Sequence, residues 1–489
     1  MRIYSRDKKA QHPTQSFFHL RANDKSHGKL VRILNIHVSG ARVNNFFSTM
    51  AITLQAQSSL PPDSQRFLDS LGFFGWQLGL ERIKKLCQFF NQPQLKYPTV
   101  HIAGTNGKGS TAAMLAAMGK AAGLRTGLYT SPHLVQLNER IQVNGAPVSF
   151  QEIEDILQNC RMLMEKMQAT YFEALTVIAF QIFAQRNVEL AIIETGLGGR
   201  LDATNVVQPE VSVITTIGLE HQKYLGRTLA AIAREKAGII KKNVPCVSGA
   251  RQEAAREQIR QRCRQLRAPL YELSEHADIK DISASPNGLQ FTLASSHFNL
   301  NLIDVACALH GRHQANNAAL AILAVSLLRE KSFSMPDDVI RRGLQTAYWP
   351  ARLQVLPTQP AIIVDAAHNA DGMRVLARNL RESFKFRRLL VVMGLLEDKT
   401  LAPIFRAWQD LSPRFFFATP ATDRARPAVQ LAQAARGFGF NAKTFVTPAA
   451  AFVESRKICR DDDLLCITGS HYLIGELMRV GCLPLPYNN

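Results

Sequence analysis

The stretch 97–123, YPTVHIAGTNGKGSTAAMLAAMGKAAG, predicts a strand, a glycine-rich loop and a helix. Residues 99–103 form a short apolar run rich in β-branched residues, which is typical of a buried parallel strand. Glycines let a backbone fold tightly around an anion, a lysine supplies a mobile positive charge, and a helix N-terminus favours negative charge. We expect Ser110 or Thr111 to begin an Ala-rich helix. We expect the loop to bind nucleotide phosphates through Gly104, Thr105, Asn106, Gly107, Lys108, Gly109 and Ser110.

This loop departs from the strict phosphate-binding pattern G-x-x-x-x-G-K-[ST]. The first glycine of that pattern would fall on Ile102, and Gly109 follows Lys108 where the pattern has Ser or Thr. A glycine-rich turn by itself is often only a tight connection. The string GTNGKGS, together with its strand and helix, resembles the Mur ligase superfamily, ATP-dependent enzymes that join an amino acid to a carboxylate. Within that superfamily it is most similar to the folylpolyglutamate synthase branch.

Composition indicates a globular protein of two or three domains. The chain has 489 residues, of which 46% are hydrophobic, enough for full cores. Its apolar runs are all shorter than the roughly 20 residues that span a bilayer, so we expect no membrane partner. The eight cysteines form no C-x-x-C pair, which argues against a disulfide framework or a zinc site. A cytoplasmic location fits this cysteine pattern best.

The net charge of +19 could indicate nucleic-acid binding. Part of this charge is local, since residues 1–49 hold nine Lys/Arg against two Asp/Glu, and residues 251–267 hold six Arg against two Glu on a predicted amphipathic helix. No aromatic-interleaved or helix-turn-helix pattern accompanies it, so we expect a solvated basic face and no specific nucleic-acid partner. Residues 1–49 are expected to be a disordered basic extension; a transit peptide or an upstream start codon are the alternatives.

Polar side chains follow the predicted strands of the N-terminal half. Glu194 ends the apolar strand 188–194 and is followed by three glycines within four positions, which indicates a magnesium ligand. Ser131 follows the strand 124–130, and His221 is expected to end a fourth strand level with Ser131 and Glu194. The carboxyl ends of such strands are where open α/β sheets place ligands. The resemblance implies that Ser131 and His221 also bind magnesium.

Further segments extend the resemblance, which covers about residues 63–489. The segment E-T-G-L-G-G-R-L-D-A-T-N (194–205) is its most specific part, and R-E-K-A-G-I (234–239) implies that Lys236 is carbamylated and binds a second metal ion. Thr170 and Glu173 also form a capping-box pattern that requires no function. The residues that the resemblance places against the pteroate or folate are Gln77, Leu78, Gly79, Leu80, Thr170, Tyr171, Phe172, Glu173, Leu201, Asp202 and Ala203.

A second alternation of strands and helices begins near residue 345. The expected fold class is therefore α/β, with an N-terminal phosphate-loop ATPase domain on a doubly wound sheet (50–344) and a smaller C-terminal Rossmann-like domain (345–489). The resemblance gives Asn317, Arg352 and Asp365 as ATP contacts. His368 either caps a turn or approaches the reacting phosphate.

The whole pattern is identified as that of a bifunctional dihydrofolate synthase/folylpolyglutamate synthase. This resemblance implies a ligase that adds L-glutamate to dihydropteroate and to tetrahydrofolates, with ATP as co-substrate, two Mg²⁺ ions, and Lys108, Lys236 and His368 in the catalytic machinery. We expect a monomer. The alternatives are a monofunctional folylpolyglutamate synthase, another Mur-type amino acid ligase, or a non-catalytic nucleotide-dependent protein that binds nucleic acid.

Overall fold

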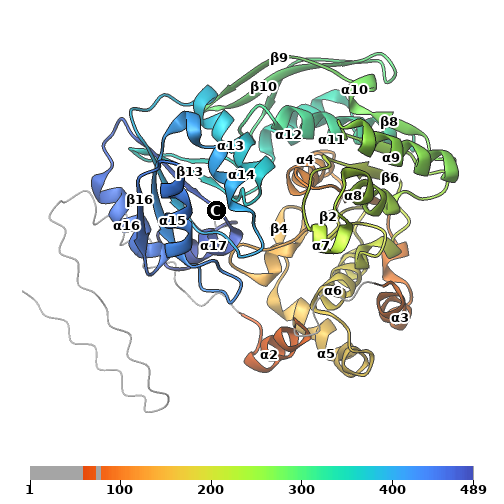
Figure 1. Cartoon of the computed structure of the whole chain (residues 1–489). Coiled ribbons are helices and arrows are strands. Elements are labelled where there is room, and N and C mark those ends of the chain that lie inside the picture. The colour runs from red at the N-terminus through yellow and green to blue at the C-terminus, as the bar shows by residue number, and fades with distance from the viewer. Residues whose placement is uncertain (1–58, 73–78, 488–489) are drawn as a thin grey trace, which may run out of the picture. The chain divides into compact units, whose positions relative to one another are not determined.

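The computed structural model describes residues 59–72 and 79–487 (Figure 1). The predicted extension at 1–49 and two predicted substrate residues, Gln77 and Leu78, lie outside the described residues. All described residues belong to one compact unit, Ser58–Asn489. They form three β-sheets with helices packed against them.

The largest sheet has the strand order β4-β3-β2-β5-β1-β6-β7-β8. Its strands are β1 (Thr99–Ala103), β2 (Thr126–Tyr129), β3 (Ile141–Val143), β4 (Ala146–Pro147), β5 (Leu190–Glu194), β6 (Val211–Ile214), β7 (Cys246–Ser248) and β8 (Leu270–Glu272). The strands from β2 to β8 in this order run parallel, and β3 and β4 add an antiparallel edge. The carboxyl ends of β2, β5, β1 and β6 therefore meet at one edge, as sheets of this kind require for ligand binding.

Helices bury both faces of this sheet. Val100 and Ile102 of β1 face a core shared with α4, α11 and α12, whereas Ala191 and Ile193 of β5 face a core shared with α5 and α6. This alternation explains why the strand sequences are apolar throughout. The helices of this part are α2 (Pro62–Leu71), α3 (Glu81–Phe89), α4 (Lys108–Ala121), α5 (Phe150–Met167), α6 (Tyr171–Gln185), α7 (Gln222–Leu225), α8 (Leu229–Lys236), α9 (Glu253–Leu266), α10 (Leu273–His276), α11 (Gln314–Arg329) and α12 (Asp337–Thr346), with short 3₁₀ turns η2 (Pro93–Leu95), η3 (Leu137–Arg140), η4 (Ala203–Val206) and η5 (Ala237–Ile239).

A three-stranded antiparallel sheet of β9 (Asp278–Ser285), β10 (Gly288–Ser295) and β11 (Leu300–Cys307) packs on α11; Figure 1 shows β9 and β10 in green. Leu289, Phe291 and Leu293 of β10 alternate with more exposed residues and join the same core as α4 and α11. A period of two with one face buried is the expected pattern for such a sheet.

The third sheet has the order β12-β13-β17-β14-β15-β16 and is drawn in blue in Figure 1. It is parallel except for the edge strand β12. Its elements are β12 (Gln354–Leu356), β13 (Ala361–Asp365), α13 (Ala370–Ser383), β14 (Leu389–Met393), α14 (Leu401–Arg406), η6 (Gln409–Leu411), β15 (Arg414–Ala418), α15 (Ala428–Gly437), β16 (Ala442–Phe445), α16 (Pro448–Ile458), β17 (Leu464–Thr468) and α17 (His471–Arg479).

This architecture confirms the expected α/β class with a large parallel sheet and a second, C-terminal sheet. The strand at 99–103 is confirmed residue for residue. The expected helix start at Ser110 or Thr111 is wrong, since α4 begins at Lys108 directly after Gly107, whose left-handed conformation ends the loop earlier. The predicted domain boundary at 344/345 falls in the last turn of α12 and stays a prediction.

Candidate active site

The phosphate loop joins the end of β1 to the start of α4. A Cβ atom on Gly104 would lie 1.8 Å from Thr215 Oγ1, and Gly107 has φ 92°, in the left-handed region that favours glycine. Thr215 Oγ1 and Thr216 Oγ1 both donate to Asn106 O, at 2.8 and 3.0 Å. The glycines and the residues that follow β6 thus hold the loop in one tight conformation.

Lys108, Glu194 and Ser131 meet at the carboxyl ends of β1, β5 and β2. Lys108 Nζ lies 3.3 Å from Thr105 O and 3.9 Å from Glu194 Oε1. Ser131 N donates to Glu194 Oε2 at 3.3 Å. Glu194 is only 4% exposed. Burial raises the pKa of Glu194, and the charge of Lys108 opposes this rise.

Lys236 is the last residue of α8, and its side chain contacts the phosphate loop. Its side chain is buried, and its Nζ donates to Gly104 O at 2.6 Å. Burial, together with the charge of Lys108, lowers the pKa of Lys236 to about 7. The structure therefore brings Lys236 against the phosphate loop, and its carbamylation stays a prediction.

The expected position of His221 at the end of a strand is wrong. β6 ends at Ile214, and His221 follows seven residues later with φ 50°, just before α7. The intervening loop does not continue the strand because it is fastened over the phosphate loop, where Thr105 Oγ1 donates to Gly218 O at 3.2 Å. Burial lowers the pKa of His221 to about 4. Its role as a metal ligand stays a prediction.

The donor set at this edge fits a hard divalent cation. Glu194 and Ser131 offer oxygen atoms, and His221 offers a ring nitrogen. Within residues 59–72 and 79–487, no three His, Cys, Asp or Glu side chains come close enough to form a metal site by themselves. An ion here would therefore need hydroxyl, water and phosphate oxygens as well, which is the set that Mg²⁺ prefers.

Arg352 and Asp365 lie where the linker after α12 meets the third sheet. Arg352 Nη2 lies 3.3 Å from His471 Nε2. The two carboxylate oxygens of Asp365 accept hydrogen bonds from Leu353 N at 2.7 Å and Ala367 N at 2.8 Å. Asp365 thus fastens the segment that carries Arg352 to β13. A contact of either residue with ATP stays a prediction.

His368 follows β13 and faces the loop that precedes α7. Its Nδ1 lies 2.8 Å from Ala366 O, and its Nε2 lies 3.1 Å from Glu220 Oε1. The Nδ1 side of the ring thus faces a backbone carbonyl oxygen, and the Nε2 side faces the carboxylate of Glu220. Burial alone would raise the pKa of Glu220, but the hydrogen bond from His368 and nearby positive charges hold it well below its usual range.

Asn317 lies in the first turn of α11 and packs directly on the phosphate loop. Its Nδ2 donates to Gln314 Oε1 at 2.8 Å, so its Oδ1 faces Gly107, where a Cβ atom would lie 2.5 Å away. Gln314 Nε2 in turn donates to Ser110 Oγ at 3.3 Å. The structure therefore joins Asn317 to the loop itself, and its contact with the nucleotide base stays a prediction.

The segment 170–173 opens α6 as a capping box, which confirms that prediction. Thr170 Oγ1 accepts from Glu173 N at 3.3 Å, and Glu173 Oε2 accepts from Thr170 N at 2.8 Å. Arg82 Nε, at the start of α3, lies within 3.1 Å of both Glu173 oxygens. This ion pair ties the start of α3, just after Gly79 and Leu80, to the start of α6.

The predicted substrate residues that the structure describes gather around the start of α6. The ring of Phe172 lies against Gly196, where a Cβ atom would be 2.5 Å from Phe172 Cζ, and Arg140 lies 5.6 Å from the centre of the Tyr171 ring. Leu80, Tyr171, Phe172 and Ala203 pack on one hydrophobic cluster. An aromatic, partly apolar surface with a cation beside it is the kind of surface that a flat aromatic ligand requires.

Asp202 joins this surface to β1. Its Oδ2 accepts from Leu197 N at 2.7 Å, and its Oδ1 accepts from Thr204 Oγ1 at 2.5 Å. Thr204 Oγ1 also lies 2.8 Å from His101 Nε2. Burial raises the pKa of Asp202. These bonds hold the glycine-rich segment and the neighbouring Leu201 in place beside the strand that carries the phosphate loop.

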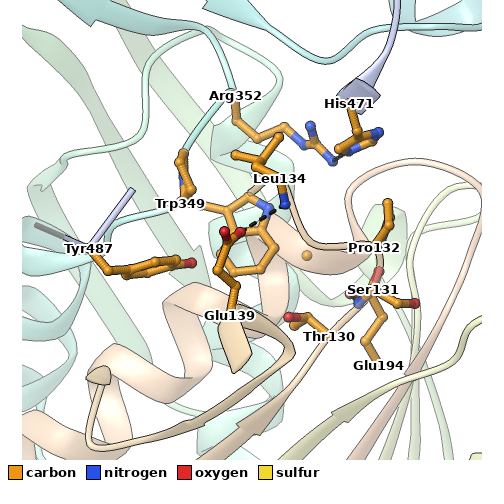
Figure 2. A pocket seen from close by; sticks show the side chains of 12 residues that line it. Thr130, Ser131, Pro132, Leu134, Glu139, Glu194, Trp349, Arg352, His471 and Tyr487 are labelled. Atoms are coloured by element: carbon orange, nitrogen blue, oxygen red, sulfur yellow. Dashed lines mark hydrogen bonds between the residues drawn. The ribbon is translucent and has the colours of Figure 1, made fainter. Parts of the chain in front are cut away.

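A pocket connects the phosphate loop with the C-terminal residues (Figure 2). Figure 2 shows Ser131 and Glu194 together on one side and Arg352 beside His471 on another. Trp349 forms part of the wall and approaches the first turn of α4. The lining residues are Gly109, Thr130, Ser131, Pro132, Leu134, Glu139, Glu194, Trp349, Pro350, Arg352, His471 and Tyr487.

Comparison with known proteins agrees with this arrangement. The Mur ligase middle domain matches residues 102–325, and the glutamate ligase domain of Mur ligases matches residues 351–471. The dihydrofolate synthase/folylpolyglutamate synthase of Bacillus subtilis is 36% identical over 414 residues, which are 83% of this chain and 95% of that protein. The chain belongs to the dihydrofolate synthase/folylpolyglutamate synthase family.

Solved structures of similar ligases share this fold. The Mycobacterium tuberculosis folylpolyglutamate synthase complexed with ADP is 31% identical, with a TM-score of 0.78, covering 85% of this chain and 98% of that one. The bifunctional folylpolyglutamate synthase/dihydrofolate synthase of Yersinia pestis, complexed with AMPPNP and a Mn ion, is 30% identical, with a TM-score of 0.75, covering 88% and 100%. The expected use of ATP and a divalent metal by this ligase is thereby confirmed, and the number of metal ions stays a prediction.

Three residues at or beside the candidate site were missed by sequence reasoning. Glu220 was passed over beside His221, His471 lies after the end of β17, and Trp349 precedes Pro350 in the linker. The last two had a usable signal, since a polar residue after a parallel strand and an aromatic residue at a chain break both favour ligand sites.

Among the described residues, no helix has the length and apolar character needed to cross a bilayer.

Proposed function

We propose that this ligase joins L-glutamate to dihydropteroate, giving dihydrofolate, and to the glutamate tail of tetrahydrofolates. The observation that carries this proposal is the pocket in which Glu194 and Ser131 from the large sheet face Arg352 and His471 from the C-terminal half, with Lys108 Nζ 3.9 Å from Glu194 Oε1. A three-substrate reaction needs one place where a nucleotide, an acid and an amine meet. This pocket supplies it beside the phosphate loop.

In the first step, a carboxylate oxygen of the pteroate or folate attacks the γ-phosphorus of ATP. The bond between that phosphorus and the β,γ-bridging oxygen breaks, ADP leaves, and an acyl phosphate forms. Lys108 and the N–H groups of the loop hold the β- and γ-phosphates in line with the acid. Phosphoryl transfer depends mainly on such positioning and on stabilisation of negative charge.

In the second step, the glutamate amine attacks the acyl carbon, loses a proton, and expels phosphate to leave an amide. Arg352 offers guanidinium donors for the negatively charged oxygens of phosphate or glutamate, and we propose that His368 lies next to these oxygens. Trp349, Pro132 and Leu134 give the pocket apolar walls. Such walls exclude water, which would otherwise hydrolyse the acyl phosphate.

We propose that Ser131, Glu194, His221 and carbamylated Lys236 hold two Mg²⁺ ions at this edge. When bound, such ions neutralise the charge that develops on the transferred phosphoryl group. The buried Glu194 has the carboxylate oxygens for this task. The acceptor substrate would lie on the surface formed by Gly79, Leu80, residues 170–173 and residues 201–203, and Gln77 and Leu78 stay predicted substrate contacts.

The test is ATP-dependent incorporation of labelled glutamate, run separately with dihydropteroate and with tetrahydrofolate. We expect both acceptors to be used. We expect Lys236→Ala to abolish incorporation and Lys242→Ala, an exposed neighbour on the same segment, to retain it. Formate added to Lys236→Ala should restore part of the activity, because a small carboxylate can replace the carbamate oxygens.

Other results would redirect the proposal. Use of tetrahydrofolate alone would reduce the function to folylpolyglutamate synthase, and use of neither acceptor would leave another Mur-type amino acid ligase. Salt-sensitive binding of nucleic acid without ATP turnover would favour a non-catalytic nucleotide-dependent protein. We also propose a monomeric, cytoplasmic enzyme. The eight free cysteines support the cytoplasmic location, which cell fractionation tests, and sedimentation tests the monomeric state.

A further inference from the structure

Glu220 belongs to the N-terminal half, and its carboxylate lies close to side-chain nitrogen atoms of the C-terminal half. Its Oε1 lies 3.1 Å from His368 Nε2, 3.1 Å from Asn369 Nδ2 and 3.9 Å from Lys399 Nζ. The side chains of Glu220 and Lys399 are 11% and 10% exposed. Charge-assisted hydrogen bonds between side chains with so little exposure to solvent are strong and geometrically selective.

The backbone that carries Glu220 is fastened to the phosphate loop. Thr105 Oγ1 donates to Gly218 O at 3.2 Å, and Gly218 N donates to Thr105 Oγ1 at 3.0 Å. A Cβ atom on Gly218 would lie 2.6 Å from Asp371 Oδ2, so this loop also approaches the first turn of α13 closely. Two hydrogen bonds thus fix the backbone two residues before Glu220 to the phosphate loop.

Asn369 contacts both Glu220 and the phosphate loop. Its Oδ1 accepts from Gly372 N at 2.8 Å and caps α13, which turns its Nδ2 toward Glu220. The same Nδ2 lies 3.2 Å from Asn106 Oδ1 in the phosphate loop. Two sets of contacts, one through Gly218 and one through Asn369, thus join the nucleotide loop to the residues that follow β13.

We propose that Glu220 is a positioning residue that couples the phosphate loop to His368 and Asn369. It orients the His368 ring, which the proposed ligase reaction places next to the reacting phosphate, and holds the start of α13 against the loop. Glu220 itself touches no substrate in this proposal. The inference depends on the proposed function only for the chemical step, and its structural part rests on the contacts of Glu220 with His368 and Asn369.

A residue that only stabilises the fold or the metal site gives a different result from one that couples the phosphate loop to His368 and Asn369. If Glu220 only stabilised the fold, Glu220→Gln would lower the unfolding temperature and all activities in parallel. If it only supported the neighbouring His221, the variant would need more metal and would regain full activity at saturating Mn²⁺. A coupling role predicts loss of turnover at saturating metal with nucleotide binding retained.

The experiment compares Glu220→Gln with Glu210→Gln, which removes a carboxylate from an ion pair with Lys331 at the entrance to β6. For Glu220→Gln we expect kcat to fall by about 10- to 100-fold at saturating Mn²⁺, with the Kd for ADP changed by less than about threefold. The control should keep both values. The double variant Glu220→Gln/Asn369→Ala should lose less activity than the two single losses combined, because the two residues share a contact.

A second readout does not require the reaction. Amide exchange of residues 369–373 should quicken by about threefold or more in Glu220→Gln and stay unchanged in Glu210→Gln, since Asn369 caps this segment. Unchanged exchange, additive losses in the double variant, or full recovery with Mn²⁺ would each overturn the coupling role. If the wild type incorporates no glutamate, the proposed function fails, and the exchange result still decides the coupling.

Discussion

Replacing His101 by glutamine should make the protein less sensitive to acid. His101 lies in the middle of β1 and is fully buried. The hydroxyl of Thr204 gives its hydrogen to Asp202 Oδ1, so it accepts the hydrogen of His101 Nε2 at 2.8 Å. Among the described residues, the opposite ring nitrogen, Nδ1, has no hydrogen-bond partner. Burial lowers the pKa of His101 to about 3.

The sign and size of the effect follow from this pKa. The folded state favours the neutral ring, so the stability from His101 is present above the unfolded pKa of about 6.5 and is lost as pH falls toward 3. Between about pH 8 and about pH 5, protonation of the unfolded chain costs the wild type about 2 kcal/mol at this site. Glutamine keeps an N–H donor for Thr204 and does not titrate, so the variant escapes this cost.

The assay is urea unfolding of wild type and variant at both pH values. The stability of His101→Gln relative to wild type should rise by about 2 kcal/mol on going from pH 8 to pH 5. His297→Gln, which removes an exposed imidazole, is the matched control. An NMR titration in which His101 of the folded protein protonates near pH 6.5, or a relative stability that does not change with pH, would refute the reasoning.

Three further changes probe the loop, a charged cluster and the pocket wall. Gly107→Ala should weaken ADP binding about tenfold or more by calorimetry, because its Cβ would lie 2.5 Å from Asn317 Oδ1 on a left-handed backbone; unchanged affinity would contradict the loop geometry. Glu272→Gln should cost about 1–3 kcal/mol of unfolding free energy at pH 7, because its buried carboxylate accepts from two α9 arginines at 2.7 Å and these bonds hold its pKa below the usual range. The difference between this variant and wild type should shrink as pH falls below about 4.5, and a pH-independent difference would argue against charge as the cause. Trp349, whose ring Nε1 would lie 2.7 Å from a Cβ on Gly109, should change its fluorescence when ADP binds, and Trp349→Phe should lose that signal; an identical response in the variant would assign it to another tryptophan.

Local chemistry allowed the elements around the loop to be predicted from the sequence. The β-branched run of β1, the glycines after it and the Thr170–Glu173 capping box are each decided by neighbours within about four residues. These features were confirmed with bounds that differ little from the prediction. The start of α4 was misplaced because the pattern does not reveal which glycine takes the left-handed conformation.

The site was only partly predictable for the same reason. Glu194 ends β5 and Ser131 follows β2, and these strands are neighbours in one parallel sheet, so alternation alone brings the two residues to one edge. His221 was misplaced because the loop after β6 bends toward Thr105, a contact across more than a hundred residues. Glu220 had no signal of its own, since a carboxylate beside a histidine is usually a solvated charge.

The sequence by itself determined that a strand, a phosphate loop and a helix start the nucleotide site, because glycine conformation, strand propensity and helix capping act over a few residues. It also determined the family, through motifs whose order is kept along the chain. Only the tertiary structure decided which groups of the C-terminal half face that loop. The contacts of Glu220 with His368 and Asn369 span 148 and 149 residues, and such pairings depend on how two sheets pack, which no local pattern records.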